Sequence, residues 1–188
     1  MATTVQSNLN GVNVDTLVQT IQAIQGNPDL AKFTFRSQTQ WINGGHTKTM
    51  IQSFHGAGAE DVSRTKPFVI EGDEPPVLLG ENYGPNAVES VLQALASCMA
   101  VGFIYNAAAQ GIKVDSLDFW LEGELDLHAF LGLSDKTRPG YNQVTVNYRV
   151  KSSAPREKIE ALCNYVQKTS PVLDILRNPV PVTVNLVD

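Results

Sequence analysis

The feature that most limits how this chain can fold is the proline-free segment 86–110, which reads NAVESVLQALASCMAVGFIYNAAAQ. It is too long for a single strand, and its Ala, Leu and Gln content favours a helix. Asn86 is in position to cap the helix, with Glu89 as the reciprocal half of a capping box. Gly111 follows where a left-handed C-terminal residue is expected. The segment therefore predicts one helix of about 37 Å.

The polarity of this helix predicts where it lies. Most of its residues are apolar, and its polar residues keep to one narrow stripe: Asn86, Glu89, Ser90, Gln93 and Ser97. A helix that is apolar on most sides is buried on most sides, so we expect a core axis that other elements wrap. Polar residues recur at nearly every turn and both flanks resemble loops, which argues against a membrane span. Cys98 lies in the middle of the segment.

Charge and composition exclude several classes of function. The formal net charge is -5 and no run of basic residues occurs, so we expect no nucleic-acid partner. Residues 1–13 lack both a basic start and an apolar core, so we expect no secretory signal. No stretch of 18 apolar residues occurs, and we expect no membrane association. A reducing cytoplasm with free thiols is the predicted location.

Cysteine and histidine spacing gives no sign of a metal site. The two cysteines, Cys98 and Cys163, form no CxxC pattern. The three histidines, His46, His55 and His128, do not have metal-ligand spacing. No glycine-rich phosphate loop is present, and we expect neither a metal nor another cofactor.

The rest of the chain predicts strands before and after a second pair of helices. Helical spacing occurs over 14–25, 156–169 and a short segment after Pro171, which ends or kinks the helix before it. Partial alternation predicts a hairpin that turns at Gly44-Gly45. The predicted strands are 33–43, 46–55, 67–71, 113–125, 142–150 and a terminal PVTVNLV strand, with loops at 56–65 and 126–141. Without regular βαβ alternation, this order predicts an α+β fold.

Several ordered motifs resemble the OsmC/Ohr superfamily. The run PPVLLGENYGPNAVESVLQALASCMA is similar to the signature of that family, in which a Gly-Pro-Asn turn leads into a long helix that reaches Ala-Ser-Cys. Further similar pieces follow in the same order: the Gly-Gly turn at 44–45, EGELD at 122–126, Arg-Pro-Gly at 138–140 and Ser-Pro-Val at 170–172. The resemblance covers about residues 33–188, so we expect an OsmC-like domain at 31–188 after a helical extension at 1–30.

The resemblance implies an intertwined homodimer in which β-sheets of both chains wrap two long central helices. It also implies thiol-dependent reduction of organic hydroperoxides. In the family, a first cysteine attacks the peroxide as a thiolate and becomes a sulfenic acid. A second cysteine resolves it as a disulfide, which an external dithiol then reduces.

The cysteines of the family match this chain only in part. Cys98 matches the first, peroxidatic cysteine. Ser170 stands at the position of the resolving cysteine, and a hydroxyl cannot form a disulfide. Cys163 is an alternative resolver that would need local movement, since it lies seven residues before Ser170 on an amphipathic helix.

The helpers that activate the thiolate in the family are a glutamate at the start of the long helix and an arginine in the hairpin. Glu89 is the candidate glutamate, although the family position falls on Val88 and Glu89 also suits a capping role. His46 replaces the arginine and would be cationic only part of the time near pH 7. Arg36 and Arg138 are possible substitutes, and surface positions suit both.

Three functional hypotheses remain from the sequence. The first is an OsmC-like thiol peroxidase that uses Cys98 alone, with an apolar pocket for a small organic hydroperoxide and an external thiol reductant. The second is a catalytically inactive or different OsmC-like dimer that binds a small hydrophobic ligand. The third treats Cys98 as a packing residue, because buried cysteine behaves as a small hydrophobe. Function would then lie elsewhere, for instance in the loop 126–141.

Overall fold

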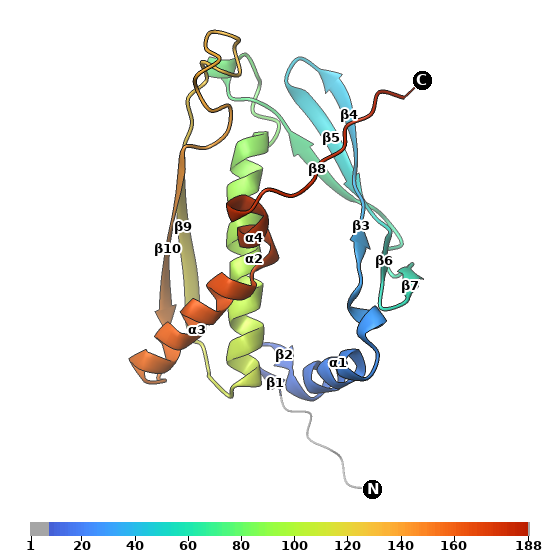
Figure 1. Ribbon diagram of the computed structural model, residues 1–188, viewed down its shortest axis with the longest axis vertical. Coiled ribbons are helices and arrows are strands. Elements are labelled where there is room, and N and C mark those ends of the chain that lie inside the picture. Colours follow the sequence, from blue (N-terminus) through green and yellow to red (C-terminus); the bar gives the residue numbers. More distant parts are fainter. Residues whose placement is uncertain (1–7, 188) are drawn as a thin grey trace, which may run out of the picture. The chain divides into compact units, whose positions relative to one another are not determined.

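The computed structural model describes residues 8–187, which divide into two compact units. The first, the N-terminal unit, comprises Asn13–Val91. The second, the C-terminal unit, comprises the described residues up to Val12 together with those from Leu92 onward. The long helix α2, Ala87–Ala109, begins in the N-terminal unit and continues into the other (Figure 1).

The N-terminal unit contains helix α1, Val14–Gly26, and two three-stranded antiparallel sheets. One sheet has the order β4-β5-β8 and the other β3-β6-β7. The predicted hairpin is present, because β4 pairs with β5 in a register that joins Asn43 to His46 across the Gly-Gly turn. The strands are β3 Thr34–Phe35, β4 Gln38–Asn43, β5 His46–Ile51, β6 Phe54–Gly56, β7 Ala59–Asp61 and β8 Phe68–Gly72.

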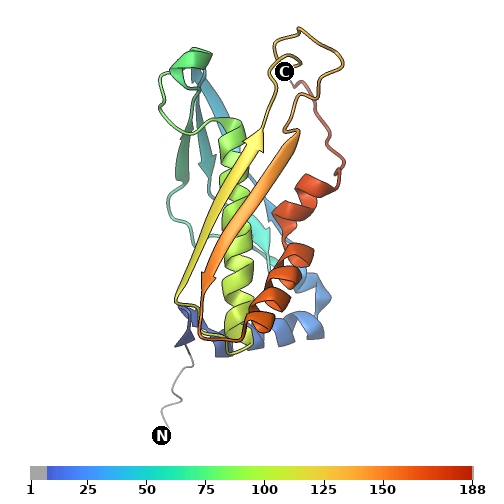
Figure 2. The ribbon, with the colours of Figure 1, turned by 90° about the vertical axis from the view of Figure 1, so that its left-hand side faces the viewer.

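The C-terminal unit packs a two-stranded ribbon and two helices against α2 (Figure 2). The ribbon is formed by β9, Ser116–Glu124, and β10, Gln143–Lys151. Their register sets Phe119 opposite Tyr148, with ring centroids 5.2 Å apart. Helix α3, Arg156–Thr169, contributes Leu162 and Val166 to the same core.

Within the C-terminal unit, the Asn10 side chain joins the start of the described chain to the segment that follows α2. Strands β1, Asn8–Leu9, and β2, Val12–Asn13, form a short hairpin that the sequence did not predict. The Asn10 side chain donates to the carbonyl of Ile112 at 2.8 Å and accepts from the N–H of Val114 at 2.9 Å. It therefore satisfies two backbone groups just beyond the end of α2.

Helix α2 is less buried in one chain than its composition predicts. Its buried residues are Leu95, Met99, Phe103, Ala107 and Ala108, which follow one face. Val101 and Tyr105 are 53% and 49% exposed. Within one chain, α2 is therefore a core helix on one face only.

Among the described residues, α2 is also the one helix whose length and composition would allow it to cross a membrane. A core helix of a soluble protein passes the same test, so this is weak evidence for a span.

Some predicted boundaries need correction. The predicted strand 33–43 is interrupted at residues 36–37, and 46–55 is interrupted at 52–53. The predicted loop 56–65 contains β7. The terminal PVTVNLV segment forms no strand and joins none of the sheets among the described residues.

Candidate active site

Cys98 and Ser170, which the sequence resemblance matches to the two redox cysteines of the family, are in direct contact within the C-terminal unit. Cys98 Sγ lies 3.2 Å from Ser170 Oγ, in a hydrogen bond in which either atom can donate. Cys98 is half-buried, whereas Ser170 is only 5% exposed. Residues 72 positions apart in the chain thus meet at one point.

The junction of two helices holds Ser170 in this position. Its N–H donates to the carbonyl of Val166 at the end of α3. Its hydroxyl oxygen accepts from the N–H of Leu173 in the first turn of α4, Pro171–Arg177, at 3.3 Å. Pro171 suits the first position of α4, where a missing N–H costs nothing. Ser170 therefore ends one helix and caps the next, and both roles restrict its side chain.

Cys163 lies apart from this pair, on α3 and against β10. It is half-buried and is a hydrogen-bonding partner of the Tyr148 hydroxyl. Burial raises the pKa of Tyr148 well above its usual range, and the interaction with Cys163 raises it further. Cys163 also borders an open groove of about 690 Å³ whose lining includes Trp120, Arg149 and Arg156.

His46 is oriented by a carboxylate and an aromatic ring of the N-terminal unit. Its Nε2 lies 2.8 Å from Glu71 Oε2, and its ring stacks on Tyr83 with centroids 4.5 Å apart. Lys48 Nζ lies 3.1 Å from the other carboxylate oxygen of Glu71. The hydrogen bonds from His46 and then Lys48 hold the pKa of Glu71 below its usual value. A carboxylate-oriented histidine can hold or transfer a proton at a fixed place.

Asp73 organises the loop between β8 and α2, and sequence reasoning missed this role. It is 3% exposed, and its carboxylate accepts from the backbone N–H groups of Glu74, Glu81 and Tyr83. Desolvation raises the pKa of Asp73, but the three backbone donors outweigh it and leave the pKa below its usual value. Gly84 belongs to the same loop, and a Cβ there would collide with the carbonyl of Glu71. The glycines and prolines of this loop are typical of irregular structure, so nothing in the sequence indicated that the Asp73 side chain holds its backbone in place.

Glu89 caps α2. The Asn86 N–H donates to Glu89 Oε2 at 2.9 Å, and the Glu89 N–H donates to Asn86 Oδ1 at 2.8 Å. The capping box expected from the sequence is therefore present. It leaves the Glu89 carboxylate engaged at the helix start, in the N-terminal unit.

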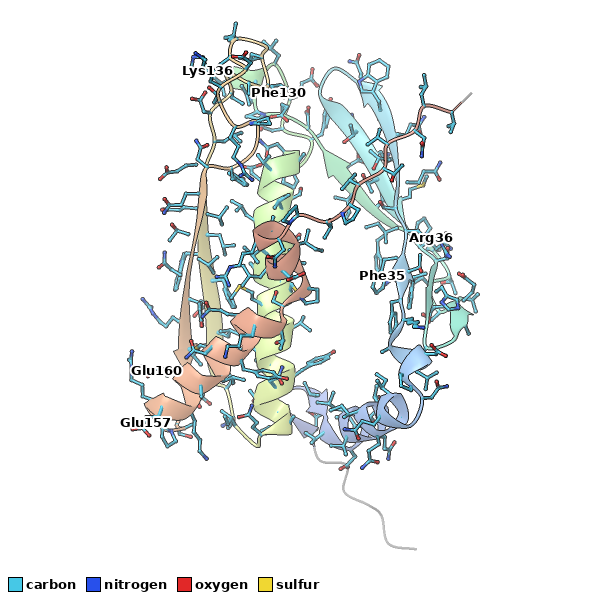
Figure 3. All side chains as sticks on the ribbon, viewed as in Figure 1. Phe35, Arg36, Phe130, Lys136, Glu157 and Glu160 are labelled. Atoms are coloured by element: carbon cyan, nitrogen blue, oxygen red, sulfur yellow. The ribbon has the colours of Figure 1, made fainter. Side chains whose placement is uncertain are left out.

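The remaining candidate cations are on exposed segments. Arg36 makes a two-armed ion pair with Glu60 at 2.9 and 3.0 Å on the surface of the N-terminal unit. Arg138 is exposed in the loop that joins β9 to β10. Figure 3 shows Phe130 and Lys136 in that loop, at the end of the ribbon opposite Glu157 and Glu160 of α3.

Comparison with protein families gives one match. The family described as OsmC-like protein matches residues 80–185, a range that includes Cys98, Cys163 and Ser170. No curated protein matches the chain.

Solved structures give several matches. An OsmC-like protein from Mycoplasma pneumoniae is 14% identical, with a TM-score of 0.59 over 78% of this chain and 89% of that one. An OsmC-like protein of unknown function from Vibrio cholerae is also 14% identical, with a TM-score of 0.54 over 75% and 92%. An organic hydroperoxide resistance protein OsmC from Legionella pneumophila is 16% identical, with a TM-score of 0.51 over 77% and 89%. At these identities the matches show a shared fold, and they agree with the α+β class expected from the sequence.

Proposed function

Because this chain belongs to the OsmC-like protein family, we propose that it reduces organic hydroperoxides with a single redox cysteine, Cys98. The observation that carries the proposal is the 3.2 Å contact between Cys98 Sγ and Ser170 Oγ. The contact joins the two positions that the family signature uses for redox chemistry. The similarity in fold to a protein named for organic hydroperoxide resistance supports the same chemistry.

The proposed reaction has two stages. The Cys98 thiolate attacks one oxygen of the hydroperoxide, the O–O bond breaks, and the alkoxide leaves and takes a proton to become an alcohol. The sulfur is oxidised by two electrons to a sulfenic acid. An external thiol then attacks this sulfur, releases water and forms a mixed disulfide, which a second thiol reduces to restore Cys98.

Ser170 makes the external thiol necessary. A hydroxyl cannot form a disulfide, so Ser170, which contacts Cys98, cannot resolve the sulfenic acid. Cys163 is a hydrogen-bonding partner of Tyr148 instead. The proposed enzyme therefore depends on a reductant from solution, which fits the free thiols of both cysteines and a reducing cytoplasm.

We further propose that the active form is a homodimer. Val101 and Tyr105 lie one turn apart on α2 and expose about half of their surface. Large exposed apolar side chains on a core helix favour burial by a second chain. Light scattering should give about twice the chain mass of 20.4 kDa, and a mass of one chain would contradict the dimer.

The direct test of the function is consumption of cumene hydroperoxide in the presence of a dithiol. Cys98→Ser should abolish turnover, whereas Cys163→Ser should retain it. Equal turnover by the wild-type protein and Cys98→Ser would refute the proposal.

A second candidate function is the binding of a small ligand without redox chemistry. The groove beside Cys163 favours it, since a volume of about 690 Å³ suits a small molecule. Arg156 in its lining is paired with Glu160 at 2.6 Å, and Arg149 lies over the Trp120 ring, so the groove offers both charged and aromatic contacts to a ligand. If Cys98 does not react with peroxide, this groove is the first place to search for a ligand.

A further inference from the structure

The hydroxyl of Ser170 is arranged to donate to Cys98. Its oxygen already accepts the N–H of Leu173, which occupies a lone pair and leaves the hydroxyl hydrogen free for a second partner. Cys98 Sγ lies 3.2 Å away and is the partner that the structure gives for that hydrogen. A thiolate can only accept, so in the ionised state of Cys98 the hydroxyl must be the donor.

We propose that Ser170 is a second catalytic residue, whose hydroxyl donates a hydrogen bond to the Cys98 thiolate and so increases the ionised fraction at neutral pH. This inference rests on the proposed peroxidase function and adds a residue to it. A hydrogen bond to the charged form of a group favours that form, and the thiolate is the nucleophile. Bonds to an ionised partner are also stronger than bonds between neutral groups.

The surroundings of Ser170 suit a hydrogen bond to a charged sulfur. Ser170 and Asp73 are the only polar or charged side chains that are buried among the described residues. Water competes little for a hydroxyl that is 5% exposed, and low local dielectric strengthens its bond to a charge. Because the α3–α4 junction fixes the side chain, little conformational freedom is lost when the bond forms.

A serine also keeps this role through the whole reaction. A cysteine at this position would be consumed as a resolving thiol, whereas a hydroxyl is not oxidised by a hydroperoxide. Ser170 can therefore donate to the thiolate before the reaction and to the oxidised sulfur after it. No covalent step involves its oxygen.

The test is the rate of alkylation of Cys98 by iodoacetamide between pH 5 and pH 10. A Cys163→Ser background leaves Cys98 as the only thiol in the chain. Ser170→Ala should slow alkylation at pH 7 roughly tenfold, the effect of losing one hydrogen bond to a charged group. The rate at pH 10, where ordinary thiols are ionised, should change little. Ser170→Thr keeps both the hydroxyl and the cap and should restore the rate at pH 7.

Controls separate this role from helix capping and from the peroxidase itself. Thr169→Ala removes the neighbouring exposed hydroxyl and should leave the pH profile unchanged. If Ser170→Ala fails to fold, Ser170→Gly replaces it, because glycine at an N-cap costs only a few tenths of a kcal/mol. A profile for the hydroxyl-free variant equal to that of the background protein would overturn the inference. The alkylation assay uses no peroxide, so this failure is distinct from a wild-type protein that does not consume hydroperoxide.

Discussion

Ser170→Cys should convert this chain into a two-cysteine peroxidase. The sulfur–oxygen distance of 3.2 Å exceeds a disulfide bond length of about 2.05 Å by only about 1.1 Å, so a thiol at this position is within reach of Cys98 after a small adjustment. After peroxide oxidises Cys98, the new thiol should attack the sulfenic sulfur, release water and close a disulfide. Resolution would then no longer need a thiol from solution.

The size of the effect follows from the separation of the two positions. A cross-link between residues 72 apart removes loop-closure entropy from the unfolded chain that is equivalent to about 4 kcal/mol at 25 °C. For a chain of 188 residues, this corresponds to a rise in melting temperature of roughly 8–16 °C. Comparing the oxidised and reduced forms of the same variant cancels the cost of the altered N-cap.

The assay is intact mass and thermal melting of Ser170→Cys after one equivalent of cumene hydroperoxide. We expect a loss of two hydrogens, no sulfenic acid to trap, and a melting temperature that dithiothreitol lowers. Thr169→Cys is the matched control, because it adds a thiol one residue away on an exposed site and should form no disulfide with Cys98. If Ser170→Cys shows a trappable sulfenic acid and no disulfide, the contact between positions 98 and 170 does not exist in solution.

Three further predictions concern stability. Glu71→Gln should lower the melting temperature at pH 7, and the difference from wild type should vanish at acid pH. Folding depresses the pKa of Glu71 below its usual value of 4.5, so the carboxylate stabilises the fold above pH 4.5 and this stabilisation is lost as the pH falls through the depressed pKa of the folded protein. An equal difference at both pH values would contradict the link to ionisation. Asp73→Ala should leave three backbone N–H groups without their acceptor, and limited proteolysis should then cut the loop before α2 faster than in wild type. Phe103→Ala, at a side chain that is 1% exposed, should reduce the free energy of unfolding in urea by about 3–5 kcal/mol, and a loss below 1 kcal/mol would show that this core is absent.

The elements of the fold were largely predictable because their signals are local. The capping box at Asn86 and Glu89 fixed the start of α2 to within one residue. Alternation gave β9 and β10, and helical spacing gave α1 and α3. The burial of α2 was not predictable, because its composition does not say whether its own chain or another chain covers an apolar face. The terminal segment was misassigned for a similar reason, since alternation predicts a strand but does not supply a neighbouring edge.

The sequence identified the candidate residues of the site but could not predict the distances between them. The family resemblance brought Cys98 and Ser170 to attention, but sequence spacing could not give their 3.2 Å contact, which depends on the bend at the α3–α4 junction. The sequence also could not predict the partners of His46. Glu71 comes from a strand 25 residues away and Tyr83 from a loop that Asp73 shapes. Long-range contacts of this kind depend on the tertiary structure, on which local patterns carry little information.

The central claim is that Cys98 is a peroxide-reactive thiol. The most direct measurement is the intact mass of the wild-type protein and of Cys98→Ser within seconds of adding cumene hydroperoxide, with and without a sulfenic-acid trap. We predict rapid gain of one oxygen, or of one trap molecule, on the wild-type protein and none on Cys98→Ser. No gain on the wild-type protein at modest peroxide excess, or an equal gain on both proteins, would contradict the claim.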